Sequence, residues 1–187
     1  AALLTARRRK ALPMIEEQVT AVLRQLAIPH ARFIVELEAS PGYTPSGADQ
    51  VQFLFSANKE MPPAEISRIA SGGEISRVML ALKSLVSGSR MLSTIIFDEI
   101  DAGISGETAL KMGGILQELS ADLQVINITH LPQIAGKGNH HFVVFKEDTP
   151  SGTITSIRKL NGYERVEELA RMVGGDNPSE SARRAAE

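Results

Sequence analysis

The stretch that most constrains the fold is a short apolar run, residues 94–97, which ends in two carboxylates, Asp98 and Glu99. Such a short run of mostly β-branched and aromatic residues predicts a strand that is covered on both faces. A second run of this kind, residues 125–129, leads directly to His130. In open α/β sheets ligands bind beyond the carboxyl ends of the strands, so these polar residues mark the candidate site.

A third feature, Ser71-Gly72-Gly73-Glu74, precedes a helical pattern. A serine at a helix start accepts a hydrogen bond from a free backbone N–H, and a glutamate three residues later completes a capping box, which is a purely structural explanation. Two consecutive glycines weaken a helix, however, and are typical of places where something approaches the backbone closely. A helix N-terminus with bare N–H groups binds anions. We therefore interpret this stretch as a phosphate contact.

The adjacent carboxylates suit the chemistry of a nucleoside triphosphate. One of Asp98 and Glu99 can reach Mg²⁺ through its waters, and the other can orient or deprotonate an attacking water. An acidic turn at a strand end and an ordinary hydrogen-bonded histidine are the structural alternatives. The order Ser-Gly-Gly, Asp-Glu, His along one chain favours half of a nucleotide-triphosphate site.

Three segments resemble the ATP-binding-cassette (ABC) ATPases, in the form found in their SMC-like branch. ASGGEISRVMLALK is similar to the signature segment, STIIFDEIDAGISG to the Walker B strand and D-loop, and INITHLPQIA to the switch-histidine segment. The combination of FDEIDAGISG with THLPQIAGKGNHHFVVFK is closest to the bacterial DNA-repair members of that branch. The resemblance runs from about Ile66 to Lys146 and extends more loosely to both ends.

The resemblance implies catalytic roles for three residues. Asp98 resembles the aspartate that holds Mg²⁺ through water, and Glu99 resembles the catalytic glutamate that positions or activates the hydrolytic water. His130 resembles the switch histidine, which contacts the γ-phosphate of ATP from the same head.

The resemblance also implies that ATP is sandwiched between two heads. Ser71, Gly72 and Gly73 would contact the γ-phosphate bound to the opposite head, and hydrolysis would release the two heads. Ser105 stands where many ABC proteins carry an aspartate in the D-loop. We keep Ser105 as a candidate nucleotide contact, although this departure leaves the communication role of the D-loop open.

A phosphate loop of the form Gly-x-x-x-x-Gly-Lys-Ser/Thr is missing from the sequence, in which only Gly136-Lys137-Gly138 comes near it. In the family that loop, and a glutamine that senses Mg²⁺, lie in an amino-terminal half beyond a coiled coil. The resemblance therefore implies an α/β fold, the carboxy-terminal lobe of an ABC/SMC-type ATPase head, with a P-loop NTPase-like parallel sheet and flanking helices. Such a chain needs the N-terminal lobe as a partner and by itself is expected to be inactive.

Residues 1–27 follow a helical pattern, in which apolar side chains recur every three or four residues and which Pro29 ends. An amphipathic helix packed on the domain explains this pattern, but the resemblance favours the end of a coiled-coil stem, with residues 28–187 forming the lobe. Strands are predicted at 31–39, 51–55 and 123–128, and helices at 74–88, after 106 to about 120, and from 132. A loop or hairpin connection is predicted at 40–49, a hairpin around 148–152, and a helical tail from 165 with a break at 174–175.

Composition excludes several classes of protein. The 187 residues contain no cysteine, which excludes disulfides and thiolate metal sites, and the net charge of −2 makes the chain as a whole a poor electrostatic partner for DNA. No apolar run approaches the roughly 20 residues that cross a bilayer, and no secretory signal opens the chain. Because it lacks an initiator Met and begins within a helical pattern, we expect a segment excised from a longer protein.

The functional prediction is an SMC-like ATPase lobe that acts in repair and recombination of broken DNA in the bacterial cytoplasm, at the nucleoid and away from membranes. DNA and a second copy of the head are the implied partners, with ATP and Mg²⁺ as cofactors. Another SMC-like ATPase or an ABC transporter subunit is an alternative, but a transporter subunit predicts proline at Ile100 and aspartate at Ser105. A non-hydrolysing docking scaffold is the other alternative, which the retention of Glu99 and His130 argues against.

Overall fold

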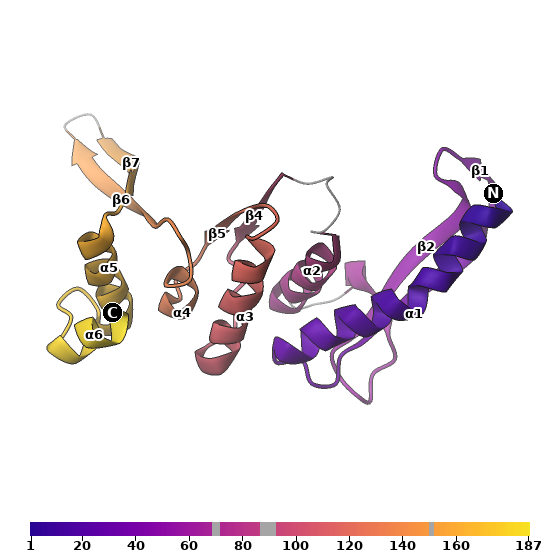
Figure 1. The fold of residues 1–187 in the computed structure, drawn as a ribbon, viewed down its shortest axis with the longest axis horizontal. Helices are drawn as coiled ribbons and strands as arrows, with labels where there is room; N and C mark the ends of the chain where they lie inside the picture. Colours follow the sequence, from indigo (N-terminus) through magenta and orange to yellow (C-terminus); the bar gives the residue numbers. More distant parts are fainter. Residues whose placement is uncertain (69–71, 87–92, 150–151) are drawn as a thin grey trace.

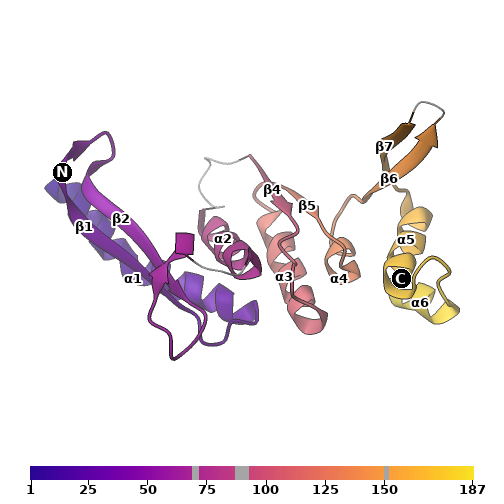
Figure 2. The same ribbon diagram turned by 180° about the vertical axis from the view of Figure 1, so that it is seen from behind.

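The computed structural model of the chain describes residues 1–68, 72–86, 93–149 and 152–187. Its elements follow one another in an elongated row, with the two termini at opposite ends (Figures 1 and 2). In chain order they are α1 (Ala2–Gln25), β1 (Arg32–Thr44), β2 (Gly47–Ser56), β3 (Ala64–Glu65), a 3-10 turn (Ile66–Arg68), α2 (Gly72–Val86), β4 (Thr94–Asp98), α3 (Gly106–Leu119), β5 (Gln124–Ile128), α4 (Pro132–Ala135), β6 (Phe142–Thr149), β7 (Gly152–Lys159), α5 (Gly162–Gly174) and α6 (Glu180–Ala186).

The first helix lies along the β1–β2 hairpin. Val19 and Leu23 are fully buried, in a core cluster that also includes residues of β1, β2 and α2. Near the tip of the hairpin, the Asp49 carboxylate accepts a hydrogen bond from the Thr5 hydroxyl at 2.6 Å and forms an ion pair with Arg8 at 2.7 Å. The predicted helix is thus confirmed as an amphipathic element packed on its neighbours, and the stem boundary at residue 27 remains a prediction.

The hairpin is longer than the sequence predicted. The hairpin connection expected at 40–49 is confirmed but is much shorter than predicted, because β1 extends to Thr44 and β2 begins at Gly47, which leaves a tight turn between them. The pairing register shifts between Ala39 and Thr44, and this irregularity accommodates Pro41-Gly42 within the strand. Glycine and proline therefore mark a bulge here rather than the end of the strand.

The centre of the molecule is a parallel pair of strands, β4 and β5, joined by α3. Their register pairs Thr94 with Gln124 and Asp98 with Ile128. The strands, α3 and α4 share a buried cluster into which α2 also projects Leu80. The predicted helix from about 106 to 120 and the strand before His130 are both confirmed.

The expectation that β4 is covered on both faces is wrong for the described chain. Ile95 and Phe97 are buried, but Ile96 on the opposite face is 63% exposed. Ile126 and Ile128 of β5 are also exposed. The cause is that only one face of this two-stranded sheet is covered by described elements, so an apolar surface remains open.

Glycine allows α3 to approach α4 closely at one of the two consecutive glycines of α3, Gly113. A Cβ on Gly113 would lie 3.1 Å from the Lys137 side chain and 3.2 Å from the Gln133 carbonyl oxygen. A Cβ on Gly114 would have no described atom of another element within 4 Å, so Gly114 makes no such close contact.

The C-terminal elements form the predicted hairpin and helical tail. β6 and β7 pair antiparallel, with residues 150–151 of the predicted turn outside the described residues. Asn161 and Glu164 form a capping box that starts α5, and Arg165 ties this helix to α4 by donating to the Gly136 carbonyl at 2.6 Å. No helix within the described ranges is both long enough and apolar enough to cross a membrane.

Candidate functional site

The two central strands bring the candidate catalytic residues to one edge of the sheet. β4 ends at Asp98 and β5 ends at Ile128, and the Glu99 N–H donates to the Ile128 carbonyl at 3.2 Å. This bond continues the pairing one residue beyond β4, so that Glu99 lies beside the segment that carries Thr129 and His130. The strand ends therefore meet as predicted, at the edge where α/β sheets bind ligands.

Glu99 has an unusual backbone conformation. Its φ is +49°, in the left-handed region that residues other than glycine seldom adopt. Such conformations cost free energy and concentrate at functional sites, where the surrounding structure enforces them. The Asp98 and Glu99 side chains are exposed, and no described residue forms an ion pair or side-chain hydrogen bond with them. Both carboxylates are thus available to a ligand.

A buried carboxylate that the sequence interpretation gave no role lies behind this edge. Asp101 is fully buried and its Oδ2 accepts a hydrogen bond from the Thr129 hydroxyl. The Thr129 hydroxyl in turn accepts the Leu131 N–H at 3.0 Å. His130 Nδ1 is 3.7 Å from the same Asp101 oxygen, while the histidine side chain is 68% exposed. The only sequence signal was the position of Asp101 in the Walker B-like segment.

The start of α2 lies against the segment that follows β4. Ser71 falls outside the described residues, but Gly72 and Gly73 are the first residues of the helix. A Cβ on Gly73 would lie 2.6 Å from the Ala102 carbonyl oxygen, whereas Gly72 is exposed with no described atom within 4 Å of its Cβ position. The two glycines therefore differ: Gly73 permits contact within the chain, and Gly72 leaves its surface open to a ligand.

Arg77, one turn along α2, is a second residue that the sequence interpretation missed. It is half-buried, and its Nε has no hydrogen-bond partner among the described residues. Burial lowers the pKa of the Arg77 guanidinium, and the nearby Glu74 carboxylate opposes this shift. A guanidinium remains charged at neutral pH, so Arg77 adds positive charge near the start of α2.

Ser105 occupies the N-cap position of α3 and is exposed. Its side chain makes no capping hydrogen bond, although serine at this position ordinarily does. The hydroxyl can therefore reach a group outside the helix.

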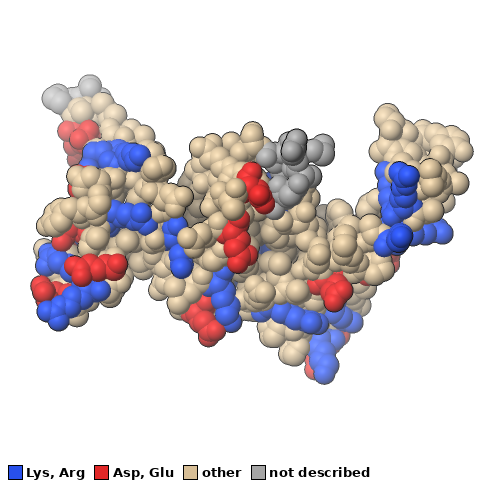
Figure 3. All heavy atoms as spheres, in the orientation of Figure 1, with Lys and Arg blue, Asp and Glu red and all other residues tan. Residues whose placement is uncertain are grey.

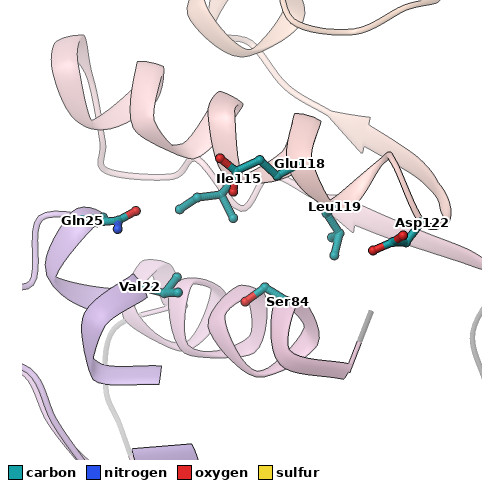
Figure 4. Close-up of a pocket in the computed structure, with 7 residues that line it drawn as sticks. All are labelled: Val22, Gln25, Ser84, Ile115, Glu118, Leu119 and Asp122. Carbon is teal, nitrogen blue, oxygen red and sulfur yellow. The ribbon is translucent and has the colours of Figure 1, made fainter. Parts of the chain in front are cut away.

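A cleft on the described surface lies away from this edge. It encloses about 320 Å³ between α1, α2 and α3, and none of the candidate residues lines it (Figure 4). Two of its lining residues are Glu118 and Asp122, whose carboxylates repel phosphate. No three described histidine, aspartate or glutamate side chains are grouped to hold a metal ion. The candidate site therefore lies at the exposed edge of the sheet, where β4 and β5 end, and not in this cleft.

Charge on the face drawn in Figure 3 is divided into separate groups. Lys and Arg side chains gather on α1 and again near the C-terminal helices, with acidic side chains between and among them. This distribution agrees with the net charge of −2.

Comparison with known proteins finds relatives of one kind among curated sequences. No family model matches the chain. The chain is 42% identical over 180 residues to the DNA repair protein RecN of Haemophilus influenzae and 43% identical over 183 residues to that of Rickettsia prowazekii, matches that cover 96% and 98% of the chain. It spans about a third of the length of these curated relatives, 32% and 33%.

Solved structures with the same fold are SMC heads. A chain from work on ATP-driven dimerization and DNA-stimulated activation of SMC ATPases is 16% identical with a TM-score of 0.58, and the match covers 92% of this chain and 99% of that one. The Smc head domain with a coiled coil and joint from Pyrococcus yayanosii is 19% identical with a TM-score of 0.61, over 83% of this chain and 28% of that one. The chain therefore has the mixed α/β fold of SMC ATPase heads and resembles, across nearly its whole length, a segment of the bacterial DNA repair protein RecN, as its motifs predicted.

Proposed function

We propose that this chain is the carboxy-terminal lobe of a RecN-like ATPase head, and that the whole protein hydrolyses ATP during repair and recombination at DNA double-strand breaks. The observation that carries this proposal is the shared edge of β4 and β5, which brings Asp98, Glu99 and His130 together beside the start of α2. The similarity to RecN over nearly the whole chain supports the assignment to DNA repair.

The open apolar face supports a second lobe as partner. Ile96, Ile126 and Ile128 expose hydrophobic side chains on the uncovered side of the sheet. An amino-terminal lobe that adds strands and carries the phosphate loop would cover them and complete the ATP site. The lobe described here, which lacks that loop, would then be inactive by itself.

Each residue at the edge would do a distinct job. Asp98 would hold Mg²⁺ through water, and its exposed carboxylate, unpartnered among the described residues, fits this role. The ion would neutralise charge on the β- and γ-phosphates. Glu99 would orient the attacking water and receive its proton, and His130 would donate a hydrogen bond to the γ-phosphate.

The head would act as a dimer. Ser71, Gly72 and Gly73 would face the γ-phosphate held by the opposite head, where the exposed N-terminus of α2 suits an anion. Ser105 would contact the nucleotide or the opposite head through its uncapped hydroxyl. ATP would bring two heads together and hydrolysis would part them. We place the protein in the bacterial cytoplasm on the nucleoid, with DNA bound by the full-length molecule and α1 continuing into a coiled-coil stem.

The test is Glu99→Gln in the full-length protein, with Glu107→Gln as the matched control. Glu107 is also exposed, and its carboxylate forms an ion pair with Lys111 on the same helix, at 2.8 Å. We expect Glu99→Gln to abolish turnover and to lengthen the lifetime of the ATP-bound dimer, measured by steady-state ATPase assay and light scattering. The control should behave like the parent protein. Equal behaviour of both variants would favour a non-hydrolysing docking scaffold.

A further inference from the structure

We propose that Asp101 is the positioning residue for His130: its buried carboxylate accepts a hydrogen bond from Nδ1–H of the imidazole and thereby directs Nε2 toward the γ-phosphate. This inference rests on the proposed function of His130.

The carboxylate of Asp101 is buried and accepts few hydrogen bonds from the described residues. An ionised carboxylate offers about four acceptor positions, yet among the described residues Oδ2 receives only the Thr129 hydroxyl and Oδ1 has no partner. Burying a charge without compensating partners is costly. The site therefore favours an additional donor.

His130 is the donor already in place. Its Nδ1 lies 3.7 Å from Asp101 Oδ2, just beyond hydrogen-bond distance. Catalytic hydrogen bonds are often long in unliganded sites and shorten when the substrate binds. The ring is 68% exposed, so it has room to rotate and close this gap.

Thr129 fixes the carboxylate independently of the histidine. Its hydroxyl donates to Asp101 and accepts the Leu131 N–H, which ties the segment after β5 to the segment after β4. The acceptor is thus held rigidly while the imidazole swings onto it. With Nδ1 on Asp101, the opposite ring nitrogen points away from the buried carboxylate and toward solvent.

The consequence for the chemistry is a defined assignment of protons. A neutral imidazole carries one N–H, and the partner of one nitrogen decides which nitrogen holds it. Asp101 selects the Nδ1–H form in the unliganded chain. When phosphate is bound, a ring that carries hydrogen on Nε2 as well donates to Asp101 and to the γ-phosphate together.

The first measurement is the ¹⁵N NMR spectrum of histidine-labelled protein at about pH 8, above the ordinary range of histidine, in which the two neutral tautomers have distinct shifts. We expect His130 to be mainly Nδ1–H in the parent and to shift toward Nε2–H in Asp101→Asn. An amide oxygen accepts more weakly than a carboxylate, and an amide nitrogen turned toward the ring forbids a proton on Nδ1. Asp122→Asn, at the distant cleft, is the control that should change nothing.

If Asp101 served only to link the two segments, Thr129→Val should change the His130 tautomer as Asp101→Asn does. Thr129→Val also breaks the link between the two segments, but it leaves the carboxylate facing His130. If the tautomer is unchanged in Asp101→Asn, or if the parent is mainly Nε2–H, the proposal is overturned. Retention of Nδ1–H in Thr129→Val, together with its loss in Asp101→Asn, supports it.

Kinetics of the full-length protein distinguish the role proposed for Asp101 from the role proposed for His130. We expect Asp101→Asn to lower kcat on the order of tenfold or more with little change in KM, as for other residues that orient a reacting group. If His130→Ala leaves kcat unchanged, the proposed function of His130 fails. If His130→Ala lowers kcat while Asp101→Asn alters neither kcat nor the tautomer, only the role of Asp101 fails.

Discussion

The two glycines at the start of α2 offer a matched pair of substitutions. Gly73→Ala places a methyl group 2.6 Å from the Ala102 carbonyl oxygen, about 0.8 Å inside the ordinary contact distance of 3.4 Å. The obstacle is backbone, so either α2 or the segment after β4 must move. Gly72→Ala adds the same methyl group where no described atom lies within 4 Å.

The expected effects on stability have opposite signs. Overpacking of this kind costs about 1–3 kcal/mol, and improved helix propensity offsets at most about 1 kcal/mol of it. Gly73→Ala should therefore lower the free energy of unfolding, by up to about 3 kcal/mol. Gly72→Ala should leave the free energy unchanged or raise it by up to about 1 kcal/mol.

Urea unfolding of both variants and the parent, followed by circular dichroism, measures this difference. If the two variants are equally stable, the contact between Gly73 and Ala102 does not constrain the fold. Gly72→Ala has a second use, because its methyl group lies on the surface proposed to face the opposite head. We expect it to weaken ATP-dependent dimerisation of the full-length protein without loss of stability.

Two further predictions concern packing and acid stability. Gly113→Ala should destabilise the chain by about 1 kcal/mol, because its Cβ would press on the Gln133 carbonyl and the Lys137 side chain. Gly114→Ala, where no such contact exists, should stabilise the chain by up to about 1 kcal/mol. Urea unfolding midpoints that shift in the same direction in both variants would contradict this. The hydrogen bond from Thr5, followed by the interactions with Arg8, lowers the pKa of Asp49. The resulting stabilisation should be complete above the unfolded-state pKa of about 3.9 and lost as pH falls through the lower folded-state value. Asp49→Asn should therefore unfold earlier than the parent at neutral pH, with the gap closing in strong acid, and a gap that is independent of pH would refute the assignment.

Local patterns were sufficient to predict the elements that position the site. The apolar runs before Asp98 and His130 became β4 and β5, and the helix expected after Gly106 is α3. These predictions succeeded because strand and helix periodicity, turn residues and caps act within a few residues of each other. The same signals misjudged Pro41-Gly42, because the partner strand holds this pair in a bulge.

Features that depend on contacts distant in sequence were not predictable. Nothing in the string around Asp101 shows that it is buried or that Thr129, 28 residues later, donates to it. The sequence suggested that Gly73 leaves room for a ligand, and it could not show that the missing Cβ also makes room for the Ala102 carbonyl oxygen. The apolar composition of β4 predicted that both of its faces are covered. The sequence could not show that elements of this chain cover only one face and leave the other for another lobe.

The most direct test of the account is a calorimetric titration of Mg·ATP into this chain, alone and in the presence of the amino-terminal lobe. The split-site account predicts no heat of binding from the chain alone and clear binding once the second lobe is supplied. Tight binding by the chain alone would contradict it, because the phosphate-binding element would then lie within these 187 residues.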